Sequence, residues 1–338
     1  MSQAVSIAAA SLAAKILLVS RGYVYAAASA ERWVAQGFLL YMEGLISTKG
    51  KELGMIEDCA AVTELLAQWS FVVATSDKIQ SGANGNMDVD VDVAGRVIRL
   101  LLDRPSFDAL PDCLRSGASG GDNEGAKIRL VPVLFIQGVD IQQTLANRSG
   151  SKSGPRFQME VNRKNFANIN AYCHRCHPIG GSGSGGGDAA AAAVAGPRTS
   201  LYGGYDEERT QQGTADREDS SSGAGDENGD EGAAVAVAAA AGASEGAVQS
   251  NSGGSALDEL GVHPLCNALA TAIRNESVKE KNVEILEEAA RVTYALGGGQ
   301  TVFCKSGKDR TAMCVTLQQS KALGEKHGCG SGTERVSE

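Results

Sequence analysis

The 338-residue sequence predicts an α/β fold in which a mixed sheet is preceded by a helical region and interrupted by a long disordered insert. Short apolar runs, which are typical of buried strands, alternate with segments whose apolar residues recur at helical spacing. A glycine-containing loop joins the last predicted strand, which we expect to lie at the centre of the sheet, to the last predicted helix, as in phosphate-binding loops. A stretch rich in glycine, alanine and acidic residues separates the two groups of elements. We therefore expect one domain built from two distant parts of the chain.

Residues 1–80 are predicted to be mainly helical. Apolar residues recur at helical spacing over Ala30–Leu45 and again over Glu52–Trp69. Phe71–Ala74 is then expected to form a short strand. The apolar stretch Ala8–Val19 resembles a signal peptide only loosely, because Lys15 interrupts it and no basic residue precedes it. We interpret that stretch as an amphipathic helix.

Residues 81–178 contain predicted strands and two predicted helices. The alternation in Asp88–Val93 favours a half-buried strand. Its aspartates resemble the start of an EF-hand loop, but Val93 and Arg99 occupy the positions that require glycine and glutamate, which argues against calcium. The other elements expected here are two buried strands, Val97–Leu102 and Leu130–Ile136, and two helices, Asp140–Asn147 and Gln158–Tyr172.

Residues 179–255 are predicted to be a disordered insert, because their composition offers too little apolar surface to offset the entropy of ordering. Ordered structure is expected again over residues 256–326. The capping-box pattern Ser277–Glu280 predicts the start of a helix that Gly297–Gly299 ends. A strand over Gln300–Phe303 and a helix over Thr311–Leu323 follow. Residues 327–338 are expected to be a flexible tail.

The charge and cysteine content limit the possible functions. The formal net charge is −9, with 31 Lys and Arg against 40 Asp and Glu, which argues against a nucleic-acid partner. A site for an anionic substrate would need a local concentration of cations. Eight cysteines at irregular spacings do not suggest a disulfide framework and indicate a reducing, cytoplasmic compartment. Since no run reaches the roughly 20 apolar residues of a transmembrane helix, we expect only peripheral membrane association.

A cysteine and an arginine separated by five residues lie between the last strand and the last helix, in the segment Cys304-Lys305-Ser306-Gly307-Lys308-Asp309-Arg310-Thr311. Five intervening residues let a loop wrap once around a phosphate with its backbone N–H groups pointing inward. The N-terminus of the following helix adds a positive dipole end, and Arg310 can add a bidentate pair of hydrogen bonds. The same field favours the thiolate of Cys304. The pattern predicts a cysteine-dependent phosphatase.

The loop supplies a candidate for each catalytic role. Cys304 would attack phosphorus to form a phosphocysteine that water hydrolyses, and Thr311 would hydrogen-bond the sulfur. Asp309 is the best local candidate for the general acid and base. Two lysines in the loop favour a substrate with more than one phosphate, and we expect neither a metal nor another cofactor. The predicted substrate-binding residues are Lys305, Ser306, Gly307 and Lys308.

The loop and the residues after it, Ala312-Met313 and Val315–Leu317, resemble the signature of the inositol polyphosphate 4-phosphatases, types I and II. Upstream segments are similar to the C-terminal half of that family, namely Gly37–Leu40, Glu52–Asp58, Val131–Phe135, Gln142–Ala146 and Val161–Lys164. The resemblance thus covers most of the chain outside the insert. The Asp-Arg-Thr ending is also similar to that of myotubularins and Sac-type phosphatases, in which an in-loop aspartate is a proposed acid.

The resemblance implies removal of the 4-phosphate from phosphatidylinositol 3,4-bisphosphate, without a metal, to leave the 3-phosphate. It implies that Cys304 is the nucleophile and Arg310 the phosphate ligand, in a cysteine-phosphatase-like domain formed by residues 81–178 and 256–326. Gly307 stands where this family's pattern predicts alanine. No membrane-binding C2 domain precedes the helices, so we expect a fragment or a shortened member. The alternatives are a catalytically weak phosphoinositide-binding scaffold and a dual-specificity protein phosphatase.

Other motifs give weaker predictions. Cys173–His177 matches the C-x-x-C-H pattern of haem attachment and could begin a zinc site, but His263 and Cys266 lie beyond the insert, and a helix end with incidental cysteines is preferred. Ser306–Asp309 lacks the first glycine of a nucleotide-binding loop, since Val302 is there. Cys314 and Cys329 could act as resolving thiols for Cys304, although the spacing turns Cys314 away from it.

Overall fold

The computed structural model describes residues 2–76, 79, 87–116, 124–139, 141–148, 153–177 and 261–327. The predicted insert and nearly all of the predicted tail therefore lie outside the described residues. The helices are α1 Ser2–Ser20, α2 Val24–Gln36, α3 Lys51–Leu66, α4 Arg104–Asp108, α5 Asp112–Arg115, α6 Ile141–Arg148, α7 Ser153–Cys176, the 3-10 helix η1 Pro264–Cys266, α10 Asn267–Arg274, α11 Glu284–Ala295 and α12 Asp309–His327. The strands are β1 Phe38–Leu45, β2 Ser70–Thr75, β3 Met87–Asp92, β4 Val97–Leu102, β5 Glu124–Ile136 and β6 Gly299–Cys304.

A six-stranded sheet in the order β3-β4-β2-β5-β1-β6 forms the centre of the molecule. β5 connects its two halves, since its first part pairs antiparallel with β2 and its last part pairs parallel with β1. β6 continues the parallel half on the other side of β1. The predicted α/β class and mixed sheet are confirmed. The prediction that Cys304 ends a central strand is wrong, because β6 pairs with β1 alone among the described strands and lies at the sheet edge.

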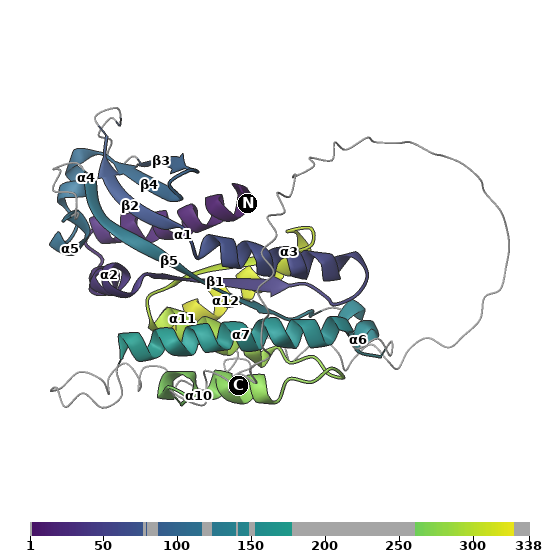
Figure 1. The fold of residues 1–338 in the computed structure, drawn as a ribbon. Helices are drawn as coiled ribbons and strands as arrows, with labels where there is room; N and C mark the ends of the chain where they lie inside the picture. Colours follow the sequence, from purple (N-terminus) through teal and green to yellow (C-terminus); the bar gives the residue numbers. More distant parts are fainter. Residues whose placement is uncertain are drawn as a thin grey trace, which may run out of the picture.

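Helices cover both faces of this sheet (Figure 1). On one face α1, α2 and α3 pack on alternate residues of β1, including Phe38 and Leu40. On the other face α7 and α11 pack on the sheet, in a core that includes Leu39 and Tyr41 of β1, and α10 packs on α7 and α11. Burial on both faces explains why β1 lacks the alternation of a half-buried strand. The helix predicted over Ala30–Leu45 is therefore wrong in its second half: α2 ends at Gln36, and all eight residues of β1 are buried.

The first helix packs into this core. By length and composition alone, residues Gln3–Ser20 of α1 are long and apolar enough to cross a membrane, unlike the expectation from the sequence. In the structure α1 contacts β6 and α2, and Ala8, Leu12 and Ile16 are fully buried. Its apolar face is thus part of the same core as the sheet.

The other predicted helices and strands are confirmed with shifted ends, except at Ser277–Glu280. Their predicted burial is wrong in two strands, since β3 is exposed at Val89 and Val91 rather than half-buried, and β4 is buried only at alternate residues. The Ser277 hydroxyl accepts a hydrogen bond from the amide of Lys279 at 3.1 Å, which forms a turn, and α11 begins only at Glu284. Asn282 holds the chain out of a helix, because its amide donates to Gln137 Oε1 at 3.2 Å and its side chain donates to the Ala272 carbonyl at 2.8 Å. The predicted capping box is therefore wrong.

Candidate active site

The carboxyl ends of the parallel strands β1, β5 and β6 lie side by side, and α/β folds commonly place their ligand sites at such ends. Cys304, the last residue of β6, lies opposite Leu45, the last residue of β1. Ile136 ends β5 opposite Gly44, one residue earlier on β1. Cys304 then leads through a four-residue connection into α12, which begins at Asp309. The predicted order of strand, loop and helix is thus present, and the loop lies at the carboxyl ends of the parallel strands.

Cys304 is nearly buried, with 7% of its surface exposed. Burial alone would raise its pKa, but hydrogen bonds from the Thr311 hydroxyl and from the amides of Thr311, Ser306 and Gly307 lower that pKa to about 7. The buried Thr311 hydroxyl has no hydrogen-bond partner placed by the geometry of the described residues, so it is available to turn towards the sulfur. The thiolate of Cys304 is consequently well populated near neutral pH.

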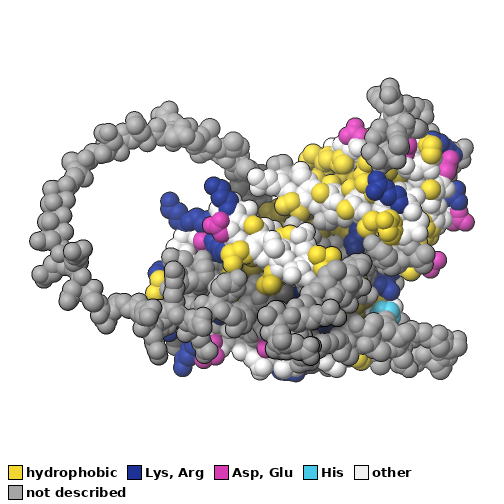
Figure 2. Space-filling model, turned by 180° about the vertical axis from the view of Figure 1, so that it is seen from behind, with side chains coloured by type: hydrophobic (Ala, Val, Ile, Leu, Met, Phe, Trp, Pro, Cys, Tyr) yellow, Lys and Arg dark blue, Asp and Glu magenta, His cyan; other side chains and the backbone are white. Residues whose placement is uncertain are grey.

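The loop has the backbone conformation and charge that a phosphate would need. Gly307 has φ +65°, a left-handed conformation, and a Cβ there would meet nothing within 4 Å. A side chain at this position would therefore be limited by backbone strain rather than by space. The side chains of Lys305, Ser306 and Lys308 are exposed. Lys305 and Lys308 thus place two exposed cations in this loop of an acidic chain. Figure 2 shows Lys and Arg side chains, with Asp or Glu side chains beside them, on one face of the molecule.

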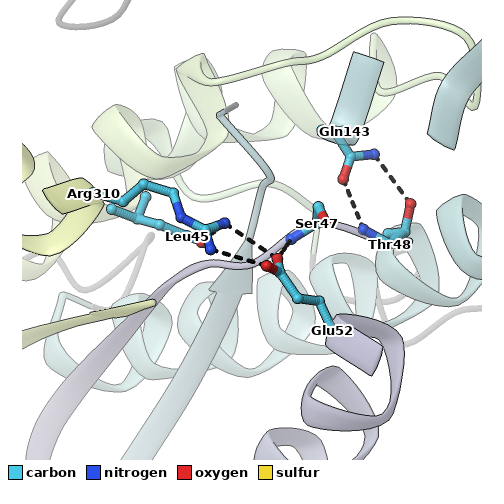
Figure 3. A network of polar contacts seen from close by, with 6 residues as sticks. All are labelled: Leu45, Ser47, Thr48, Glu52, Gln143 and Arg310. Carbon is cyan, nitrogen blue, oxygen red and sulfur yellow. Dashed lines mark hydrogen bonds and ion pairs between the residues drawn. The ribbon is translucent and has the colours of Figure 1, made fainter. Parts of the chain in front are cut away.

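Arg310, the second residue of α12, is directed towards the end of β1 and the start of α3 (Figure 3). Its Nη1 donates to the Leu45 carbonyl at 2.9 Å and to Glu52 Oε2 at 3.1 Å, while Nη2 donates to Glu52 Oε1 at 2.9 Å. This is a bidentate pair between a guanidinium and a carboxylate. Arg310 is therefore held beside Cys304 by a residue 258 positions earlier in the chain.

Glu52 is a residue of this site that sequence reasoning missed. It lies in the first turn of α3, and its Oε2 accepts a hydrogen bond from the amide of Ser47 at 2.8 Å. Burial raises its pKa, but the hydrogen bonds from Arg310 and Ser47 outweigh that effect and hold the pKa of Glu52 below its ordinary value. The sequence predicts a helix from Glu52 onwards and a family resemblance over Glu52–Asp58, but no site role for Glu52. Nothing in its local pattern points to Arg310.

The turn between β1 and α3 is also fixed from its other side. Gln143 of α6 accepts from the amide of Thr48 at 2.9 Å and donates to its hydroxyl at 3.1 Å (Figure 3). Gln143 and Thr48 are both buried. Since Ser47 lies between Thr48 and Leu45, these bonds fix the backbone that contacts both Glu52 and Arg310.

Asp309, the predicted acid, is the first residue of α12 and has an exposed side chain. This position leaves its carboxyl accessible to solvent where the loop meets α12. Cys304, Arg310 and Thr311 lie together at the carboxyl end of β6, and the residues between Cys304 and Arg310 are exposed.

The cysteine motif Cys173–His177 forms the end of α7, as preferred from the sequence. The structure nevertheless places the residues beyond the insert next to it: the sulfurs of Cys173 and Cys266 lie 3.2 Å apart, and the rings of His174 and His263 are 5.2 Å apart between centroids. Among the described residues, no three His, Cys, Asp or Glu side chains form a group that could hold a metal ion.

The two candidate resolving thiols differ in what the structure shows of them. Cys314 is buried, and its thiol donates to Glu43 Oε1 at 3.2 Å. Cys329 lies outside the described residues. Cys314 is therefore engaged with a buried carboxylate of β1.

Comparisons with known proteins agree with the resemblance. The family model described as the INPP4A C-terminal domain matches residues 28–178 and 260–332. The type II inositol 3,4-bisphosphate 4-phosphatase of Rattus norvegicus is 26% identical over 293 residues, which is 86% of this chain and 22% of that protein. The inositol polyphosphate 4-phosphatase type II of Homo sapiens is 25% identical over 296 residues, with the same two shares covered. The chain thus spans about a fifth of the length of these relatives.

Proposed function

Because the chain belongs to the INPP4A C-terminal domain family, we propose that it is a cysteine-dependent phosphoinositide phosphatase. The proposed reaction converts phosphatidylinositol 3,4-bisphosphate into phosphatidylinositol 3-phosphate. The observation that carries the proposal is the placement of Cys304 at the end of β6, directly before the loop and the helix α12 that bears Arg310 and Thr311. Hydrogen bonding within this segment lowers the pKa of Cys304 to about 7 against the effect of burial. The relatives' names supply the substrate class and the 4-position.

The first chemical step is an in-line displacement. The Cys304 thiolate attacks phosphorus, the S–P bond forms, and the bond from phosphorus to the inositol oxygen breaks. Backbone N–H groups of the loop and Arg310 stabilise the charge on the equatorial phosphate oxygens. The leaving oxygen takes a proton from Asp309, whose exposed position on the first turn of α12 suits that role.

The second step returns the enzyme to its starting state. Asp309, now ionised, accepts a proton from a water molecule that attacks the phosphocysteine. The S–P bond breaks, inorganic phosphate leaves, and Cys304 is again a thiolate. Thr311 helps both steps because its hydroxyl stabilises the thiolate as nucleophile and as leaving group. The route uses no metal or organic cofactor, so we expect EDTA to leave the rate unchanged.

Lys305 and Lys308 support a substrate with more than one phosphate. Both side chains are exposed at the mouth of the loop, where they can contact a phosphate on a neighbouring inositol carbon. A lipid substrate further implies that the protein works in the cytoplasm as a peripheral membrane protein. The two alternatives to this function, a scaffold without turnover and a protein phosphatase, predict different results in the following assay.

The test is phosphate release from phosphoinositides in vesicles, from soluble inositol phosphates and from a phosphotyrosine peptide. We expect selective release from phosphatidylinositol 3,4-bisphosphate and loss of release in Cys304→Ser. Cys59→Ser is the matched control, because burial raises the pKa of that half-buried thiol to about 11 and it lies on α3 away from the loop. Release from the peptide alone would favour the protein phosphatase. Lipid binding without phosphate release from any substrate would favour the scaffold alternative.

A further inference from the structure

The contact between Arg310 and Glu52 has a geometry that fixes an orientation. Both carboxylate oxygens of Glu52 accept from the guanidinium, at 2.9 and 3.1 Å, and the Leu45 carbonyl accepts from Nη1 at 2.9 Å. Three acceptors in these positions define the plane of the guanidinium as well as its distance from the sheet. The side chains of Arg310 and Glu52 are only 18% and 9% exposed, so water screens this pair less than it screens a surface ion pair.

We propose that Glu52 is a positioning residue that presets the guanidinium of Arg310 for phosphate binding in the Cys304 loop. The inference rests on the proposed function, since it assigns a role within the same site. In this role Glu52 does not itself bind phosphate. It acts through Arg310, and the Leu45 carbonyl supplies the third fixed point.

Glu52 can serve as a fixed reference because its own position is determined without Arg310. It is buried in the first turn of α3, where the helix dipole favours a carboxylate. Its Oε2 accepts from the Ser47 amide at 2.8 Å, and the next residue, Thr48, is held by Gln143 through two hydrogen bonds. These contacts of Glu52 and Thr48 thus link α3, the end of β1 and α6 to Arg310 of α12.

Charge and position make opposite predictions for the removal of Glu52. A carboxylate beside an anion site repels the anion, so a purely electrostatic effect means that neutral Glu52→Gln binds phosphate more tightly. A positioning role means that Glu52→Gln binds phosphate more weakly despite the gain in positive charge, because the guanidinium loses its fixed plane. The sign of the change therefore decides between the two.

The experiment measures protection of Cys304 from iodoacetamide by inorganic phosphate, which requires binding but no turnover. We expect Glu52→Gln to raise the phosphate concentration for half protection by about tenfold, the loss of one well-formed charge-assisted hydrogen bond. Glu52→Asp should restore part of the affinity, because it keeps the charge and both oxygens. Glu57→Gln, an exposed carboxylate on the same helix, should match the wild type. The thermal midpoint of each variant reports whether it is folded.

The same measurement in an Arg310→Lys background tests whether Glu52 acts through the guanidinium. A lysine ammonium cannot form the bidentate pair, so adding Glu52→Gln to Arg310→Lys should cause no further weakening. Tighter or unchanged phosphate binding by folded Glu52→Gln, or an equal weakening in both backgrounds, overturns the proposal. The proposed function fails separately, when the wild type is protected by phosphate yet releases none from any phosphoinositide.

Discussion

Replacing Thr311 with valine tests how the structure activates Cys304. The pKa of Cys304 is lowered from 9.0 to about 7 although burial opposes the change, and the Thr311 hydroxyl is the first of the hydrogen-bond donors responsible. Valine keeps the shape and the branched Cβ while it removes this donor. A hydrogen bond to a charged group contributes about 1.5 kcal/mol, and 1.36 kcal/mol corresponds to about one pKa unit. We therefore expect the pKa of Cys304 to rise to roughly 8 in this variant.

The assay is the rate of Cys304 alkylation by iodoacetamide as a function of pH, with the modified residue identified by mass spectrometry. At pH 7 the thiolate fraction should fall from about one half to about one tenth, so alkylation should slow about fivefold. At pH 10 the two proteins should react alike, since both thiols are then ionised. Thr316→Val, at an exposed position on the same helix, is the control. An unchanged alkylation profile in folded Thr311→Val would refute this explanation of the low pKa.

Three further predictions test other parts of the structure. Gly307→Ala should weaken phosphate protection of Cys304 severalfold, because alanine at φ +65° costs about 1 kcal/mol; equal protection in both proteins would contradict this. Burial raises the pKa of Glu276 against the hydrogen bonds from Gln158 and Asn162, so its stabilising effect is complete below pH 4.5 and declines as the pH rises towards the folded-state pKa. Glu276→Gln should therefore gain in thermal midpoint relative to the wild type between pH 4.5 and 7, and parallel pH profiles would argue against it. Leu12→Ala, at a fully buried position of α1, should cost about 2–5 kcal/mol in urea unfolding, whereas a loss below 1 kcal/mol would show that α1 is not part of the core.

The sequence predicted the elements whose patterns are local. The β6 strand, the loop from Cys304 and helix α12 are readable because the apolar run, the glycine and the helical spacing follow one another within residues 299–327. The sequence shows a glycine in the loop, but the left-handed backbone at Gly307 is visible only in the structure, where its φ is +65°. The four loop donors that act on Cys304 are likewise close in sequence, and their effect on its pKa followed from the motif.

The elements that were missed depend on contacts between distant residues. β1 is buried on both faces, so its residues do not alternate between apolar and polar, and their spacing predicts a helix instead of a strand. The place of β6 at the sheet edge is set by its pairing with β1, which a strand pattern does not encode. Likewise, the thiols of Cys173 and Cys266 lie in contact although 93 positions separate them.

The same distinction divides the site itself. Residues 304–311 carry the proposed nucleophile, the amides that lower its pKa and the arginine, so the short segment resembles a complete phosphate site. Yet Arg310 takes its orientation from Leu45 and Glu52, which belong to the first part of the chain. The strand that presents Cys304 is held by β1 as well, through the register that sets Cys304 opposite Leu45. The loop's chemistry is therefore local, whereas its geometry arises only when the two parts of the chain that flank residues 178–260 assemble into one sheet.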